Sequence, residues 1–402
     1  MAGDEAWRAR HAGLLTPVAA ARASPRLLSL LPMLADQRTV WLAGGTPPGE
    51  AFPLASLRVT TVDGACDVHV GAAAGGHADK NDEAYKMQQY QMVFRGYPPL
   101  FDWVCAHVRL LHAPPEGGGA VGPAPLEERV LLTCGNSDAL DKVLVALLGP
   151  GDVLLVEESN FLTSISALRP HQARGVTVAP VRTHCARAVR DACAALRARG
   201  LRPKVYYVIP TAHNPTGVSA SADARRAIYA AACEEDLLLL EDDPYLYAAF
   251  GKTGGKWLKC ADAAAEGESA NAVNEAAMPG LYGLASHAFT TSTPNAALPP
   301  SYLSMDVEER VVRVDTFSKL MAPGLRAGWV TCCHALRQSL MYHTQQSSQG
   351  VCSVSSVILA NVLQQWGNDG LDAHRAGAHP RASTSAPTRP PTPARAHVVA
   401  PY

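Results

Sequence analysis

Lys319 stands in a stretch whose residue types suit chemistry on a carbonyl group. Residues 314–329 read Val-Asp-Thr-Phe-Ser-Lys-Leu-Met-Ala-Pro-Gly-Leu-Arg-Ala-Gly-Trp, so Thr316 and Ser318 precede the lysine and a Pro-Gly turn delivers Arg326 after it. A lysine amine attacks carbonyl carbons when nearby positive charge or burial lowers its pKa, and an arginine can also bind phosphate. The stretch predicts a Schiff-base lysine beside a phosphate clamp. Taken alone, it also fits a solvated Lys–Arg pair on a loop.

Three further polar side chains come shortly after apolar runs. Asn214 follows residues 204–209, and Asp242 and Tyr245 follow residues 237–240. Together with the runs at 130–133, 153–156 and 310–314, and with helical segments between some of them, this order is typical of βαβ units in a mostly parallel sheet. Ligands of such sheets bind at the carboxyl ends of the strands. We therefore expect the three side chains to lie near Lys319 at one edge of the sheet.

Asn136 and Ser137 precede a predicted helix. The turn Cys134-Gly-Asn-Ser-Asp138 separates the strand 130–133 from a helix at 139–148. Free N–H groups and the positive dipole end of a helix bind phosphate without a dedicated charge. Asn, Ser and Asp are also ordinary helix caps. The sequence is therefore compatible with two interpretations of this position, a phosphate site and an ordinary helix cap.

The bulk composition is that of a globular chain large enough for two lobes. The chain has 402 residues, of which 48% are hydrophobic and 18% charged, and a single core stops growing below this length. A formal net charge of -1 argues against a nucleic-acid partner. No apolar run is long enough for a transmembrane helix. The ten cysteines contain no C-x-x-C pair, so they indicate neither a zinc site nor a disulfide framework.

Composition and pattern divide the chain into four parts. We expect an N-terminal arm with a small-domain segment at residues 1–40, a large domain at 41–345, the start of a C-terminal small domain at 346–375 and a disordered tail at 376–402. Residues 251–300 read as a surface insertion, because they are rich in Ala, Glu, Asn and Ser and poor in core residues. The arm is rich enough in Arg and Ala to imitate an organelle transit peptide.

The motifs taken together resemble a known family. Asn214-Pro-Thr-Gly, Glu241-Asp-Asp-Pro-Tyr245 and Ser318-Lys319 with Arg326 resemble the fold type I, class I/II aminotransferases that use pyridoxal 5'-phosphate. Phe317-Ser-Lys, and Leu42-Ala-Gly-Gly ahead of Phe52-Pro, are similar to the kynurenine/α-aminoadipate and aromatic aminotransferase branch. The resemblance implies an α/β fold with a mostly parallel central sheet and flanking helices. It also implies that residues 41–345 bind the cofactor and that the protein is a homodimer.

The resemblance implies three catalytic residues. Lys319 would bind the cofactor covalently and later move the proton at the substrate's α-carbon, and Asp242 would pair with the ring nitrogen and keep it protonated. Tyr245, with Asn214, would hydrogen-bond the 3'-oxygen of the ring. Phe161 stands where an aromatic residue, commonly tyrosine, stacks on the ring.

The remaining matches concern the phosphate and the substrate. The resemblance implies that the phosphate is held by Asn136, Ser137, Arg326 and either Thr316 or Ser318. Tyr90 would reach the phosphate of the neighbouring subunit, although its spacing to Gly96 differs by one residue from the usual pattern. Gly44 and Gly45 match a substrate-side loop. No metal site is indicated.

The expected activity is transfer of an amino group from an aromatic, kynurenine-type or aminoadipate-type amino acid to a 2-oxo acid such as 2-oxoglutarate. The cytoplasm is the expected location, with an organelle as the alternative, because the N-terminal segment fits the family's own substrate-covering arm. The family continues after the helix predicted at 354–366 into a lobe with an arginine for the substrate carboxylate, where this chain has its Pro/Ser/Thr/Arg-rich tail. We therefore expect an incomplete small domain. A cofactor-binding paralogue with impaired catalysis is the alternative function.

Overall fold

The structure is a computed structural model in which residues 13–24, 45, 47–62, 66–71, 82–90, 95–116, 123–246, 257–258 and 300–375 are described. Most of the predicted arm, Gly44, almost all of the predicted insertion at 251–300 and the whole tail at 376–402 lie outside these residues. The expectation of an incomplete C-terminal lobe concerns this tail and stays a prediction.

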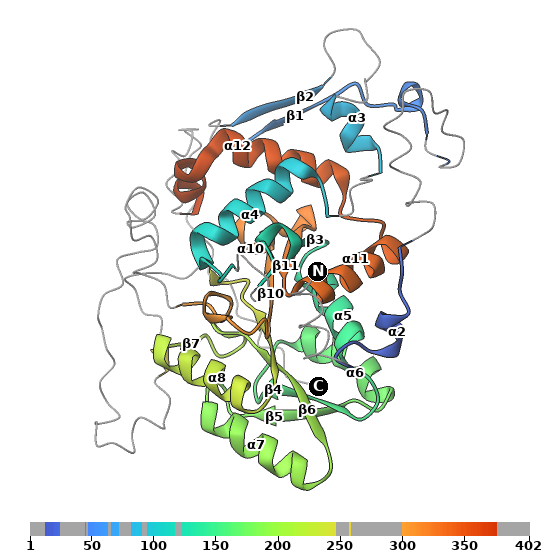
Figure 1. Ribbon diagram of the computed structural model, residues 1–402. Helices are drawn as coiled ribbons and strands as arrows, with labels where there is room; N and C mark the ends of the chain where they lie inside the picture. Colours follow the sequence, from blue (N-terminus) through green and yellow to red (C-terminus); the bar gives the residue numbers. More distant parts are fainter. Residues whose placement is uncertain are drawn as a thin grey trace, which may run out of the picture.

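A seven-stranded sheet forms the centre of the molecule (Figure 1). In spatial order its strands are β3 (Val130–Thr133), β11 (Gly328–Thr331), β10 (Val311–Thr316), β8 (Leu238–Asp242), β6 (Arg202–Val208), β4 (Asp152–Glu157) and β5 (Thr177–Val181). β11 is antiparallel to both of its neighbours, and the other strand pairs of this sheet are parallel. The carboxyl end of β3 and the amino end of β11 therefore meet the carboxyl ends of the parallel strands at one edge.

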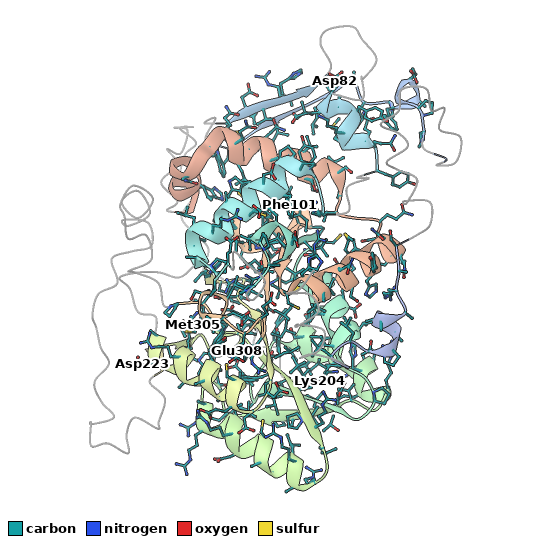
Figure 2. The ribbon with its side chains drawn as sticks, in the orientation of Figure 1. Asp82, Phe101, Lys204, Asp223, Met305 and Glu308 are labelled. Carbon is teal, nitrogen blue, oxygen red and sulfur yellow. The ribbon has the colours of Figure 1, made fainter. Side chains whose placement is uncertain are left out.

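Helices cover both faces of the sheet. One face carries α2 (Pro17–Ala20), α5 (Asn136–Leu147), α6 (Leu162–Ala173) and α11 (His334–Ser347), and the other carries α4 (Pro98–His112), α7 (Ala186–Ala198), α8 (Ala222–Glu234) and α12 (Ser353–Arg375). Phe101 of α4 is buried in the core on this second face (Figure 2). Since both faces are covered, every residue of β3, β8, β10 and β11 is buried, which explains why apolar residues predominate in these strands.

A second group of elements packs on α12. The antiparallel hairpin of β1 (Ser56–Thr60) and β2 (Asp67–Gly71) lies with α3 (Glu83–Gln88) over this helix, at the top of Figure 1. Glu83 joins α3 to α12, because its carboxylate accepts a hydrogen bond from Asn361 of α12 at 3.0 Å. It also accepts a hydrogen bond from Tyr97 at 2.9 Å. The elements β1, β2 and α3 thus pack with the C-terminal helix, although the predicted division places them in the large domain. The boundaries at 40, 345 and 375 stay predictions.

The remaining elements are short. They are α10 (Phe317–Leu320), the paired strands β7 (Ser219–Ala220) and β9 (Trp257–Leu258), and the 3-10 helices η2 (Gly49–Ala51), η3 (Leu126–Glu128), η6 (Leu303–Met305) and η7 (Pro323–Leu325). No helix within the described ranges is long and apolar enough to cross a lipid bilayer.

The predicted α/β class and the mostly parallel sheet are confirmed. The five strands predicted from apolar runs are present, with ends within two residues of the predicted ones. The helix predicted at 139–148 was placed too late, because α5 already begins at Asn136. Gly135 takes the cap position with φ 91°, a conformation that glycine adopts readily, so the chain enters the helix one turn earlier than the cap residues indicated. α12 runs beyond the predicted end at 366, with non-helical backbone at Gly367.

Candidate active site

A cavity of about 370 Å³ opens at the edge of the sheet where the strand ends meet. Ten of the predicted site residues line it: Asn136, Ser137, Phe161, Asn214, Asp242, Tyr245, Thr316, Ser318, Lys319 and Arg326. The other lining residues are Leu140, Thr163, Ser164, Ala167, Ile209, Pro244 and Pro323. These residues are spread over almost two hundred positions of the sequence. They converge because they lie in the segments that connect to the strand ends at this edge of the sheet.

Asp242 is the acidic group of the cavity. It is the last residue of β8, and one carboxylate oxygen accepts a hydrogen bond from the Asn136 side-chain amide at 2.6 Å, the other from the Tyr207 hydroxyl at 2.7 Å. Burial raises the pKa of Asp242 to about 6, while the bonds from Tyr207 and Asn136 act in the opposite direction. The group can therefore be a carboxylate near neutral pH and can pair with a protonated ring nitrogen.

The turn after β8 carries the second catalytic candidate. The hydroxyl of Tyr245 accepts a hydrogen bond from the side-chain amide of Asn214 at 3.1 Å. Asn214 comes from the loop between β6 and β7, and its peptide bond to Pro215 is cis. The pair presents one hydroxyl and one amide to the cavity, which suits an oxygen substituent on a ring.

An anion cradle forms between α5 and α10. The first-turn N–H groups of α5 have no acceptor within the helix, and the Arg326 guanidinium lies beside them, donating to the carbonyl of Cys134 at 2.8 Å. Arg326 Nη1 also lies 3.4 Å from the Ser318 hydroxyl. A methyl group built at Gly135 would come within 2.9 Å of Arg326 Nη2, so glycine leaves the arginine its place. This set of donors fits a phosphate group.

The two predicted hydroxyls differ in what they already bind. The Thr316 hydroxyl lies 3.2 Å from the carbonyl of Ala327 and accepts the Ser318 N–H at 3.1 Å, capping α10. Its oxygen also lies 2.9 Å from the Ser318 hydroxyl. Because Thr316 is engaged with the backbone on both sides, Ser318 is the better candidate for contact with an anion.

Lys319 belongs to α10 and lines the cavity. Its side chain is exposed, and within the described ranges it makes no hydrogen bond or ion pair. Phe161, which caps α6 after β4, is 39% exposed and lines the same cavity. An amine and an aromatic face are thus both available to a flat ligand.

Two predicted contacts lie away from the cavity. Tyr90 follows α3, is 56% exposed and is absent from the lining residues. Gly45 has φ 56° and does not line the cavity either, while its neighbour Gly44 lies outside the described residues. The roles of these three residues stay predictions.

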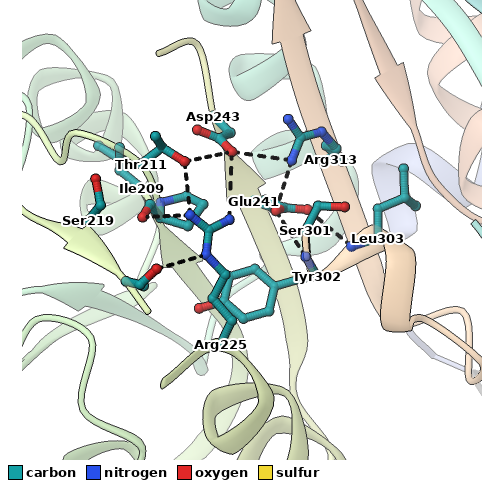
Figure 3. Close-up of polar contacts among 12 residues, drawn as sticks. Ile209, Thr211, Ser219, Arg225, Glu241, Asp243, Ser301, Tyr302, Leu303 and Arg313 are labelled. Atoms are coloured by element: carbon teal, nitrogen blue, oxygen red, sulfur yellow. Dashed lines mark hydrogen bonds and ion pairs between the residues drawn. The ribbon is translucent and has the colours of Figure 1, made fainter. Parts of the chain in front are cut away.

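Functional candidates that the sequence did not single out lie around Asp242. Tyr207 and Ser164 form a chain of hydroxyls that ends on its carboxylate. On the opposite face, Glu241 and Asp243 lie among buried arginines, with Arg313 Nη1 2.8 Å from Glu241 and 3.5 Å from Asp243 (Figure 3). Tyr207 lies inside a continuous apolar run, which gave no signal of a polar role.

An α/β fold with an exposed lysine, a buried carboxylate and an anion cradle at the strand ends is an arrangement that fits a phosphorylated ring cofactor. The family model for aminotransferase class I and II matches residues 124–376. The chain belongs to this family.

Individual relatives agree with this assignment. The chain is 28% identical over 348 residues to the mitochondrial kynurenine/alpha-aminoadipate aminotransferase of Mus musculus, with 85% of this chain and 68% of the relative covered. It is 28% identical to an aromatic amino acid aminotransferase of Schizosaccharomyces pombe, covering 83% and 66%. The crystal structure of aminotransferase Aro8 from Candida albicans superposes with a TM-score of 0.71 at 27% identity, covering 91% and 72%. The resemblance inferred from the motifs is confirmed.

The cavity residues fit pyridoxal 5'-phosphate, the cofactor of the family. A buried carboxylate suits its ring nitrogen, the Asn214–Tyr245 pair suits its ring oxygen, and the cradle at α5 suits its phosphate. The Asn136 side-chain oxygen is buried and has no hydrogen-bond partner among the described residues, so it can accept a further bond.

Proposed function

We propose that the protein transfers an amino group from an aromatic, kynurenine-type or aminoadipate-type amino acid to a 2-oxo acid such as 2-oxoglutarate. The observation that carries the proposal is the meeting of Lys319, Asp242 and Tyr245 with the phosphate donors in one cavity. The names of the mouse and Schizosaccharomyces pombe relatives support the donor class. The chain spans about two thirds of the length of each of these relatives.

Each cavity residue has a defined task in such a transfer. Bound pyridoxal 5'-phosphate supplies an electron sink for the substrate's α-carbon. Lys319 would hold the cofactor and then carry the proton to and from that carbon, as a positioned general base does. Asp242 would hold a proton on the ring nitrogen, and Arg326 with Ser318 would fix the phosphate. Tyr245 and Asn214 would hydrogen-bond the ring oxygen.

The test compares the protein with a Lys319→Ala variant. We expect the wild type, incubated with pyridoxal 5'-phosphate, to show the visible absorbance of a lysine-bound cofactor and Lys319→Ala to lack it. Lys86→Ala is the control, because this lysine is on α3 and outside the cavity. Identical spectra for the wild type and Lys319→Ala would refute the assignment of the lysine.

A second measurement separates an enzyme from an impaired cofactor-binding paralogue. The wild-type protein is mixed with kynurenine, 2-aminoadipate or tyrosine, and cofactor conversion is followed in a single turnover. We expect conversion with at least one donor and recovery on addition of 2-oxoglutarate. Cofactor binding without any conversion would instead support the paralogue.

We also propose that the protein is a homodimer in the cytoplasm, with an organelle as the alternative. The exposed position of Tyr90 outside its own cavity suits a side chain that reaches a second subunit. The name of the mouse relative includes the word mitochondrial, which keeps the organelle open. Light scattering of the purified protein and microscopy of a tagged full chain test the two proposals.

A further inference from the structure

Asp242 has a hydrogen-bond donor on each of its two carboxylate oxygens. One donor is the Asn136 side-chain amide at the start of α5, at 2.6 Å, and the other is the Tyr207 hydroxyl of β6, at 2.7 Å. The register pairs Tyr207 with Leu240, so Asp242 lies two residues further along β8 on the same face. Diagonal neighbours on adjacent strands are within reach of a tyrosine side chain.

A third residue extends this arrangement, and the Asp242 carboxylate fixes the direction of the hydrogen bonds. The Ser164 hydroxyl of α6 lies 3.0 Å from the Tyr207 hydroxyl. Tyr207 has one hydroxyl hydrogen, and a carboxylate can only accept. Tyr207 therefore donates to Asp242 and accepts from Ser164, which gives a chain from Ser164 through Tyr207 to Asp242.

All three side chains of this hydrogen-bond chain are buried. Ser164 and Tyr207 are 4% and 1% exposed, and Asp242 is 7% exposed. Burial disfavours an ionised carboxyl, whereas donated hydrogen bonds favour it. Consecutive hydrogen bonds in a low-dielectric interior also strengthen one another. The hydroxyl chain thus opposes the effect of burial on the group that faces the cofactor ring.

We propose that Tyr207, held by Ser164, is a positioning residue that keeps the Asp242 carboxylate ionised and oriented toward the ring nitrogen of pyridoxal 5'-phosphate. The inference rests on the proposed function. Neither Tyr207 nor Asp242's other donor, Asn136, needs to move for this task, since both bonds are already formed in the structure.

Tyr206 provides the matched control. It is the preceding residue of the same strand and is fully buried, but it packs in the core on the opposite face of the sheet. Among the described residues its hydroxyl has no hydrogen-bond partner. A change from tyrosine to phenylalanine therefore removes the same atom at both positions, and only at Tyr207 does it remove a bond to Asp242.

The test measures how cofactor affinity depends on pH. Full-length protein freed of cofactor is titrated with pyridoxal 5'-phosphate at a series of pH values for the wild type, Tyr207→Phe, Tyr206→Phe and Ser164→Ala. Asp242 must be ionised to pair with the protonated ring, so affinity is lost as pH falls through the pKa of this carboxyl, which is about 6. The titration of the phosphate itself is the same in every variant.

Removal of the Tyr207 hydroxyl raises that pKa, so the loss of affinity begins at a higher pH. One charge-assisted hydrogen bond corresponds to a shift of about 1 to 2 pH units. We expect this upward shift in Tyr207→Phe, a smaller one in Ser164→Ala and none in Tyr206→Phe. The nearby charges Asp243, which raises the pKa, and Arg313, which lowers it, are unchanged in all variants.

The outcomes separate the two proposals. Coincident profiles for Tyr207→Phe, Tyr206→Phe and the wild type overturn the role of Tyr207 while leaving the cofactor site in place. A wild type that binds no pyridoxal 5'-phosphate at any pH refutes the proposed function. Circular dichroism confirms that each variant is folded, and Ser164→Ala provides an independent readout because it leaves Tyr207 and its hydroxyl unchanged.

Discussion

Single residues at the end of β8 show how one acidic run serves two purposes. Glu241, Asp242 and Asp243 are consecutive, and side chains alternate between the faces of a strand. Asp242 faces the cavity, while Glu241 and Asp243 contact Arg313 on the other side. The middle residue can therefore act on a ligand while its neighbours hold the sheet together.

The Arg326 guanidinium should bind the phosphate of the cofactor and no other part of it. We expect Arg326→Met to weaken the affinity for pyridoxal 5'-phosphate about 10- to 100-fold, the effect of losing a charge-assisted hydrogen bond. Affinity for pyridoxal, which lacks the phosphate, should stay the same. Spectral titration of both ligands measures the difference, and an equal loss for the two ligands would contradict this role.

At the scale of elements, the anion cradle depends on close approach of three backbones. A methyl group built at Gly328 would lie 2.5 Å from the carbonyl oxygen of Asp315 and 3.0 Å from the Cα of Gly135. Gly328 begins β11, Asp315 belongs to β10 and Gly135 caps α5. A side chain at Gly328 would push apart the elements that carry Arg326, Ser318 and the helix N-terminus.

We therefore expect Gly328→Ala to lower the free energy of unfolding by about 1–3 kcal/mol through overpacking, and to weaken cofactor binding as well. Gly324→Ala is the control, because a methyl group at Gly324 would meet nothing within 4 Å. Gly324→Ala should change the free energy of unfolding by no more than about 0.5 kcal/mol. Urea unfolding of the two variants makes the comparison, and equal midpoints would show that the close approach relaxes without cost.

At the scale of the whole molecule, a buried ion network joins separate parts of the fold. Arg225 of α8 donates to Thr211 at 2.9 Å, and Thr211 donates to Asp243 at 3.1 Å (Figure 3). Arg313 of β10 binds Asp315 and Glu241, each at 2.8 Å. Glu241 also accepts the backbone N–H groups of Tyr302 and Leu303, so the network connects α8, two central strands and the segment that follows residue 300.

Arg313→Met should destabilise the protein by about 3–5 kcal/mol, because it leaves buried carboxylates without their main cation. Burial raises the pKa of Asp315 to about 6 against the opposing effect of Arg313. Without the arginine the folded variant holds this proton more tightly than the folded wild type does, so the loss of stability should shrink as pH falls toward and below 6. Urea unfolding at pH 5.5 and 7.5 measures both effects.

Arg190→Met is the control for the loss of an ion pair. Arg190 binds Glu234 on the surface, where the two side chains are 37% and 55% exposed, and exposed pairs contribute little. The unfolding midpoint of Arg190→Met should differ little from that of the wild type at either pH. A similar small effect for Arg313→Met would mean that water or rearranged neighbours compensate the buried charges.

Much of the sheet was predictable because its strands are covered on both faces and read as apolar runs. Polar residues directly after those runs indicated the site, since strand carboxyl ends form the ligand edge of such sheets. The start of α5 was missed because the glycine at its cap looked like part of a longer turn. Strand order and the reversed direction of β11 were not predictable, because they depend on contacts between residues far apart in the chain.

The sequence by itself determined the family and ten of the cavity residues, because reactive groups at fixed positions in short motifs are visible without a fold. The tertiary structure alone decided which groups act on those residues. Tyr207 lies in an apolar run and Ser164 in a helix with no motif, yet their hydroxyls converge on Asp242. Hydrogen bonds between separate elements depend on how those elements pack in space. The spacing of residues along the sequence does not predict them.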